Sequence, residues 1–87
     1  MHDFTAAHRT LPLGSWVKVT NLKNDKSVMV RINDRGPVAK NRILDLSYGA
    51  AMILGVGNDG VAKVRLDVIE TPTVAINIVP QVGEGPQ

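Results

Sequence analysis

The sequence predicts a single small domain that is mainly β, with one or two short helices. The length of 87 residues is enough for one compact core. Apolar residues make up 44% of the chain, but only three are aromatic, and valine and isoleucine are prominent, which favours strands. Several short segments alternate apolar and polar residues. Several short strands with one helix, in so short a chain, favour a small β-barrel.

The first clear elements are two strands joined by a tight turn. Alternation in "SWVKVTNL" (15–22) places the valines at 17 and 19 on the core face, and Lys18 and Thr20 on the solvent face. Alternation resumes in "SVMVRIND" (27–34), and Asn24 and Asp25 between the two segments are typical turn residues. The pattern therefore predicts a β-hairpin that ends at the Gly-Pro pair after "DR".

A short helix and a further strand are predicted in the second half. Ser47 precedes "YGAAMIL" as a candidate N-cap, and Gly55 or Gly57 is a candidate end. Four apolar residues fit one helical face: Leu46, Ala50, Ile53 and Leu54. In "GVAKVRLDVIE" (60–70), alternation directs Val64, Leu66 and Val68 inward.

The end of the chain allows two interpretations. "TVAINIVP" (73–80) fits either a last strand or the ordered start of a linker, and residues 81–87 are expected to form a flexible tail. The domain is therefore expected to span residues 1–80.

Composition argues against several functions. The net charge is +2, and the Lys and Arg residues are spread along the chain without a basic stripe, so we do not expect a nucleic-acid partner. The absence of cysteine removes disulfides and thiolate metal sites, and His2 and His8 match no metal pattern, so neither a metal nor another cofactor is expected. No apolar run is long enough to span a membrane, and no signal-peptide pattern is present.

Asp34 is the first candidate site residue. It lies where a strand ends and a Gly-Pro turn begins. One interpretation is turn chemistry, in which Asn33 and Asp34 bond their own backbone. The other is a carboxylate directed into a cleft from a rigid strand end, kept charged by nearby arginines.

Asp45 is the second candidate, because it interrupts the apolar run "ILDL". A buried carboxylate is costly unless it is hydrogen-bonded or functional. An apolar setting would favour its protonated form, which a general acid needs. Capping of the helix, or a place on a solvated strand face, is the alternative. A lone histidine such as His8 is more often structural or exposed than a ligand.

Three motifs in order carry a family resemblance. They are "AAHRTLP" (6–12), "VRINDRGP" (30–37) and "ILDLS" (43–47). With the segments between and after them, the chain closely resembles the rare lipoprotein A (RlpA) domain over roughly residues 4–70. The resemblance implies a six-stranded double-psi β-barrel, the fold also found in barwin-like proteins and MltA-type transglycosylases.

The resemblance also implies a function in the bacterial cell wall. Some members are lytic transglycosylases, a class of lyase, that cleave the bond between N-acetylmuramic acid (MurNAc) and N-acetylglucosamine (GlcNAc) in peptide-stripped glycan and leave a 1,6-anhydro product. Others only bind septal glycan, so a non-catalytic binding module is the alternative. The implied location is the periplasm or cell envelope, with peptidoglycan as partner and the domain as a monomer. Membrane contact is implied only through an N-terminal lipid anchor absent from these residues.

Site residues follow from the matching positions. The resemblance implies catalytic roles for Asp45, Asp34 and His8, with Asp45 ranked first as the proton donor. Arg35 and Asn33 are expected to contact the glycan. Relatives also carry an "SGE" glutamate and a first strand upstream of the matched region, and neither is found in these 87 residues. The first barrel strand is therefore expected to be missing or supplied otherwise.

Overall fold

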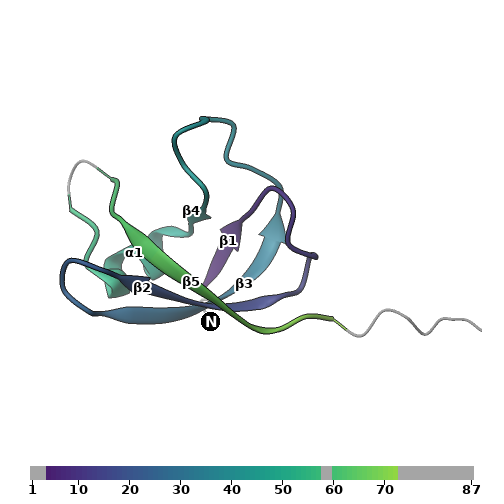
Figure 1. Cartoon of the computed structure of the whole chain (residues 1–87), viewed down its shortest axis with the longest axis horizontal. Helices are drawn as coiled ribbons and strands as arrows, with labels where there is room; N and C mark the ends of the chain where they lie inside the picture. The colour runs from purple at the N-terminus through teal and green to yellow at the C-terminus, as the bar shows by residue number, and fades with distance from the viewer. Residues whose placement is uncertain (1–3, 58–59, 73–87) are drawn as a thin grey trace, which may run out of the picture.

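One five-stranded sheet forms most of the protein. The computed structural model describes residues 4–57 and 60–72. The strands are β1 (Thr5–Ala7), β2 (Trp16–Asn21), β3 (Ser27–Asp34), β4 (Asp45–Leu46) and β5 (Val64–Glu70), and the helix α1 spans Tyr48–Leu54. Their order in the sheet is β4-β1-β3-β2-β5 (Figure 1). β1 and β3 are parallel, and the other neighbours are antiparallel. The predicted mainly-β class is confirmed.

The predicted hairpin is present as β2 and β3. Val17 pairs with Val30, and Val19 with Val28. All four valines are buried, so their alternation supplies one wall of the core. At the turn, Asp25 has a φ of 62°, a left-handed conformation that aspartate tolerates better than most residues.

The core is built from aliphatic side chains, as the scarcity of aromatic residues requires. Its buried members are Ala6, Val17, Val19, Val28, Val30, Ile32, Ala50 and Leu54. Two residues that the sequence predicts to face the core are exposed instead: Val68 is 47% exposed and Ile53 is 49% exposed. Val68 lies on β5, an edge strand, and Ile53 lies on a helix of only seven residues, so neither is covered on all sides.

Thr20 reverses the predicted alternation. The sequence places it on the solvent face with Lys18, but it is only 9% exposed, and Asn21 beside it is 2% exposed. β2 is flanked by β3 on one side and β5 on the other, so its residues are covered more than an edge strand's would be. Asn21 turns inward because its Nδ2 donates a hydrogen bond to the Leu54 carbonyl oxygen at 3.1 Å.

The helix begins and ends as predicted, although Ser47 has a different role. Ser47 is the N-cap, but its side chain makes no capping bond; its Oγ accepts a hydrogen bond from the Thr5 N–H at 3.2 Å instead. The hydroxyl thus ties the start of α1 to β1. Gly55 ends the helix with a φ of 76°, which glycine adopts without strain.

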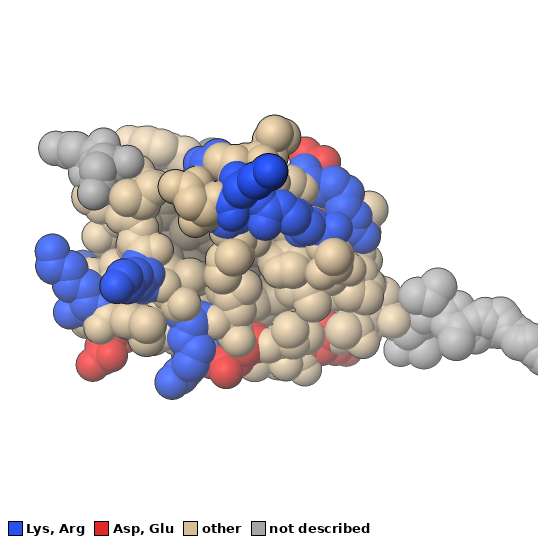
Figure 2. All heavy atoms as spheres, turned by 45° about the horizontal axis from the view of Figure 1, so that its top comes forward, with Lys and Arg blue, Asp and Glu red and all other residues tan. Residues whose placement is uncertain are grey.

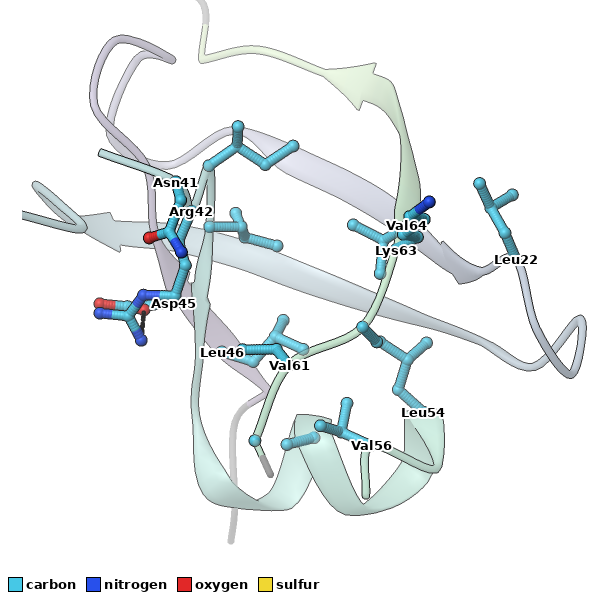
Figure 3. Close-up of a pocket in the computed structure, with 15 residues that line it drawn as sticks. Leu22, Asn41, Arg42, Asp45, Leu46, Leu54, Val56, Val61, Lys63 and Val64 are labelled. Atoms are coloured by element: carbon cyan, nitrogen blue, oxygen red, sulfur yellow. Dashed lines mark ion pairs between the residues drawn. The ribbon is translucent and has the colours of Figure 1, made fainter. Parts of the chain in front are cut away.

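An apolar groove separates the two edges of the sheet. Within the described residues, β4 and β5 are the outer strands. The groove between them has a volume of about 890 Å³. Figure 3 shows side chains from both sides converging on it, among them those of Leu46, Leu54, Val56, Val61 and Val64. A sixth strand is not among those that residues 4–57 and 60–72 form.

Two expectations concern residues beyond this part. The predicted strand at 73–80 and the tail at 81–87 lie outside the described residues. Within the described part, no helix has the length and apolar character needed to cross a bilayer.

Candidate functional site

Ala7 brings the two candidate carboxylates together. On one side it pairs with Asp34 of β3, and on the other with Asp45 of β4. Directly paired residues on neighbouring strands share a face of the sheet. Ala6 next to it is buried and pairs with core residues, so Ala7 and both aspartates lie on the opposite, outer face. The two aspartates therefore lie on the strands that flank Ala7, two strand spacings apart, or about 10 Å.

A bulge selects Asp34 for this position. The pairing of β1 with β3 shifts between Ala6 and Ala7, so that Asp34 rather than Asn33 lies opposite Ala7. The Asp34 Oδ1 accepts a hydrogen bond from the Arg35 N–H at 2.8 Å. This is the turn chemistry considered from the sequence. The side chain is exposed, and Asp34 makes no ion pair within the described residues.

Asp45 is placed differently from the expectation of a carboxylate surrounded by apolar residues. Its Oδ1 forms an ion pair with the Arg42 guanidinium at 3.1 Å, and its side chain is 41% exposed. Figure 3 shows the charged ends of both side chains at the rim of the groove, away from the apolar residues that line it. The exposure follows from the position of β4 at the edge of the sheet, where solvent reaches the strand.

His8 directly follows Ala7 and lies at the end of the same strand. Its backbone N–H donates to the Asp34 carbonyl oxygen at 3.1 Å, which continues the pairing of β1 with β3. Its ring Nδ1 accepts hydrogen bonds from the N–H groups of Thr10 and Leu11, each at 3.1 Å. Partial burial lowers the pKa of His8 below its usual 6.5, and the positive charges of Arg35 and Arg9 lower it further.

Arginines hold the loops around these residues. The Arg35 Nη1 donates to the carbonyl oxygens of His8 at 3.1 Å and Leu11 at 2.6 Å. Arg9 reaches the opposite loop, donating from Nε to the Pro37 oxygen at 3.0 Å and from Nη2 to the Ala39 oxygen at 2.6 Å. Figure 2 shows Lys and Arg side chains gathered over the upper part of the face turned forward.

Two of these residues, Arg9 and Arg42, are not among the candidates predicted from the sequence, because an arginine in sequence gives no sign of which distant carbonyl or carboxylate it will reach. Arg42 lies three positions before Asp45, and this spacing was the one available signal. Asn33, expected as a glycan contact, is exposed beside Asp34, and the structure assigns it no further role.

The arrangement is suited to acid–base chemistry on an uncharged polar substrate. Two carboxylates, a neutral imidazole and several guanidinium groups lie around the ends of β1, β3 and β4. A carboxyl group can give a proton to a leaving oxygen and take one back, and N–H donors can hold sugar oxygens. Among residues 4–57 and 60–72, no cluster of three or more His, Asp or Glu side chains could hold a metal ion.

Comparison with known proteins agrees with this geometry. The sequence model of a family described as "Lytic transglycolase" matches residues 1–66. Endolytic peptidoglycan transglycosylases RlpA are similar to the chain. The Vibrio cholerae and Neisseria meningitidis serogroup A proteins are each 58% identical over 69 residues, 79% of this chain. The Pasteurella multocida protein is 57% identical over 67 residues, 77% of this chain. These alignments cover only 26%, 29% and 23% of the respective relatives.

Proposed function

The chain belongs to the lytic transglycolase family, as an RlpA-like double-psi β-barrel domain, and on that premise we propose that it cleaves the glycan strands of peptidoglycan. The observation that carries the proposal is the placement of Asp34 and Asp45 on either side of Ala7, with His8 at the end of the same strand. The substrate is peptide-stripped glycan, and the bond broken joins MurNAc to GlcNAc.

The proposed reaction needs one group that acts first as an acid and then as a base. A protonated carboxyl gives its proton to the glycosidic oxygen as the bond from this oxygen to C1 of MurNAc breaks. The C6 hydroxyl of the same MurNAc attacks C1 and returns its proton to the carboxylate. The product is a 1,6-anhydro sugar, and water is not consumed. Ordinary glycosidases differ in using two carboxylates with water or a covalent intermediate.

Asp34 is the proton donor in this proposal. The sequence ranked Asp45 first, but its carboxylate is already engaged in an ion pair with the Arg42 guanidinium at 3.1 Å. Asp34 makes no ion pair within the described residues, and it is joined to His8 through the backbone. A glycan lying over Asp34 would exclude water from the carboxyl group during the proton transfer. The negative charge of Asp45 then stabilises the oxocarbenium-like centre.

The test compares Asp34→Asn with Asp45→Asn. Each variant and the parent chain, within the longest available form of the protein, is incubated with peptide-free glycan, and the products are weighed by mass spectrometry. Asp34→Asn is expected to lose about 10²–10⁴-fold of the anhydro product, as removal of an acid–base group typically does. Asp45→Asn is expected to lose less. Full turnover by both variants would refute the proposal.

A glycan-binding module without catalysis is the second candidate. It is supported by the exposure of both carboxylates, because a general acid usually works in an enclosed site. This candidate requires that the glycan be retained in a pull-down while its mass distribution stays unchanged. Either function implies a place in the cell envelope, where peptidoglycan is found.

The apolar groove belongs to the same proposal. A sixth strand supplied from outside residues 4–72 would meet the outer edges of β4 and β5, which pair with no further strand in the described residues, and apolar side chains beneath it. Closure there would fix β4, and with it Asp45, relative to β1. Solvent protection of the backbone amides of β5 in a longer form of the protein, compared with residues 1–87, tests this part. Equal protection in the two forms would count against it.

A further inference from the structure

The loop after β1 holds the His8 ring in one protonation form. In neutral imidazole one ring nitrogen carries a hydrogen and the other accepts hydrogen bonds. Here Nδ1 faces two backbone N–H groups, those of Thr10 and Leu11, both at 3.1 Å. Two donors on one nitrogen require a lone pair there. The ring hydrogen is therefore on Nε2, on the other side of the ring from the loop.

Arg35 closes this arrangement from outside. Its Nη1 donates to the carbonyl oxygens of both His8 and Leu11, the first and last residues of the loop. One guanidinium nitrogen thus bridges the two ends of the loop, while the ring nitrogen binds the N–H groups of Thr10 and Leu11. Arg35, which the sequence predicts as a glycan contact, therefore also shapes the loop.

We propose that His8 acts as a fixed hydrogen-bond donor through Nε2–H, with Arg35 as the positioning residue, and that acid opens the loop. Within the described part of the chain Nε2 has no hydrogen-bond partner, so this donor is available to a sugar oxygen or a carboxylate. A proton added to Nδ1 would face the N–H groups of Thr10 and Leu11, and both bonds would be lost.

The charged groups nearest His8 come from the loops and from the neighbouring strands. Partial burial and the positive charges of Arg35 and Arg9 lower the pKa of His8 below its usual value. Asp34 and Asp45 flank the preceding residue, Ala7, on the two neighbouring strands. The neutral donor is the form present at neutral pH.

The direct test needs no substrate. In the ¹⁵N-labelled chain, two-bond proton–nitrogen spectra are expected to show His8 as the neutral Nε2–H form at pH 7. The amide signals of Thr10 and Leu11 should then titrate together with the ring as the pH is lowered. A neutral Nδ1–H form would overturn the proposal. So would amide chemical shifts of Thr10 and Leu11 that stay constant while the ring titrates.

Substitutions at His8 and Arg35 distinguish the hydrogen bonds that hold the loop from the donor at Nε2–H. In His8→Asn, Oδ1 can accept from the N–H groups two and three positions later, so the loop is retained while the Nε2–H donor is lost. In His8→Ala both are lost, and the amides of Thr10 and Leu11 should exchange at least about tenfold faster than in His8→Asn. Arg35→Lys, which replaces a fork by a single ammonium, should also speed this exchange, whereas Arg65→Lys should not. Equal exchange in all four variants would contradict the proposed loop.

These measurements are independent of catalysis. A role for the His8 Nε2–H donor in binding substrate rests on the proposed transglycosylase function. The position of the hydrogen on the His8 ring does not depend on that function. If the spectra show Nε2–H and no anhydro product forms, the proposed function fails and the loop arrangement stands. If the product forms and the ring is Nδ1–H, the proposal for His8 fails alone.

Discussion

Asp34 and Asp45 pair with the same residue, Ala7, from opposite sides. One belongs to a parallel partner strand and the other to an antiparallel one. A central strand of only three residues therefore sets the separation of the two carboxylates. Because Ala7 lies on the outer face, a larger side chain there would extend between the two aspartates and would leave the core packing unchanged.

A larger side chain at Ala7 tests this directly. Ala7→Leu is expected to lower production of anhydro sugar by about tenfold or more, since small displacements of reacting groups are costly. The melting temperature should change little, because the side chain does not enter the core. Thr5→Leu is the matched control: Thr5 lies on the same face of β1, away from the aspartates, and its substitution should leave turnover near that of the parent chain.

The lowered pKa of His8 predicts a dependence of stability on pH. Below the unfolded pKa near 6.5 the unfolded chain binds a proton more readily than the folded one. The contribution of His8 to the free energy of unfolding is therefore fully present above pH 6.5. It is lost as the pH falls toward the pKa of His8 in the folded protein. In His8→Asn, this contribution to the pH dependence of the free energy of unfolding should be absent. Urea titrations of both proteins between pH 7.5 and 5 measure it, and parallel slopes would contradict the prediction.

Asn21→Ala should be strongly destabilising. The Asn21 side chain is buried, accepts a hydrogen bond from the Lys23 N–H at 2.9 Å and donates one to the Leu54 oxygen at 3.1 Å. Its loss removes both hydrogen bonds and leaves the Leu54 oxygen with only the Asn24 Nδ2 donor at 3.3 Å among the described residues, at a cost of about 1–3 kcal/mol. Denaturant unfolding would measure the loss. Asn33→Ala, at an exposed position, should stay within about 0.5 kcal/mol of the parent.

Thr20→Val is expected to stabilise the chain. The Thr20 hydroxyl oxygen is buried and has no hydrogen-bond partner in the described structure. Replacing it with a methyl group of similar size removes the cost of burying that group, about 1 kcal/mol. Thr20→Ser keeps the hydroxyl and deletes the methyl, so it should be less stable than the parent. The order valine, threonine, serine in melting temperature is the expected result, and a less stable valine variant would contradict it.

Local patterns in the sequence were sufficient for the hairpin, the helix and β5, but not for β1 and β4, the two short strands next to the candidate site. Alternation located the hairpin, and Gly55 marked the end of α1, because both depend on neighbours in sequence. The candidate site depends on pairing between distant segments. A bulge decides that Asp34 faces Ala7, and the edge position of β4 decides that Asp45 is exposed beside Arg42. Neither the bulge nor the order of the strands leaves a periodic signal in the sequence.

In the described residues β5 is an outer strand of the sheet, and this has a consequence for self-association. An exposed strand edge can pair with the same edge of another molecule and start aggregation. β5 carries three charged residues: Arg65 and Asp67 form an ion pair at 3.1 Å, and Glu70 follows at the end of the strand. Two copies brought edge to edge would have to desolvate these charged groups. These charged residues thus disfavour self-association through the β5 edge at high protein concentration.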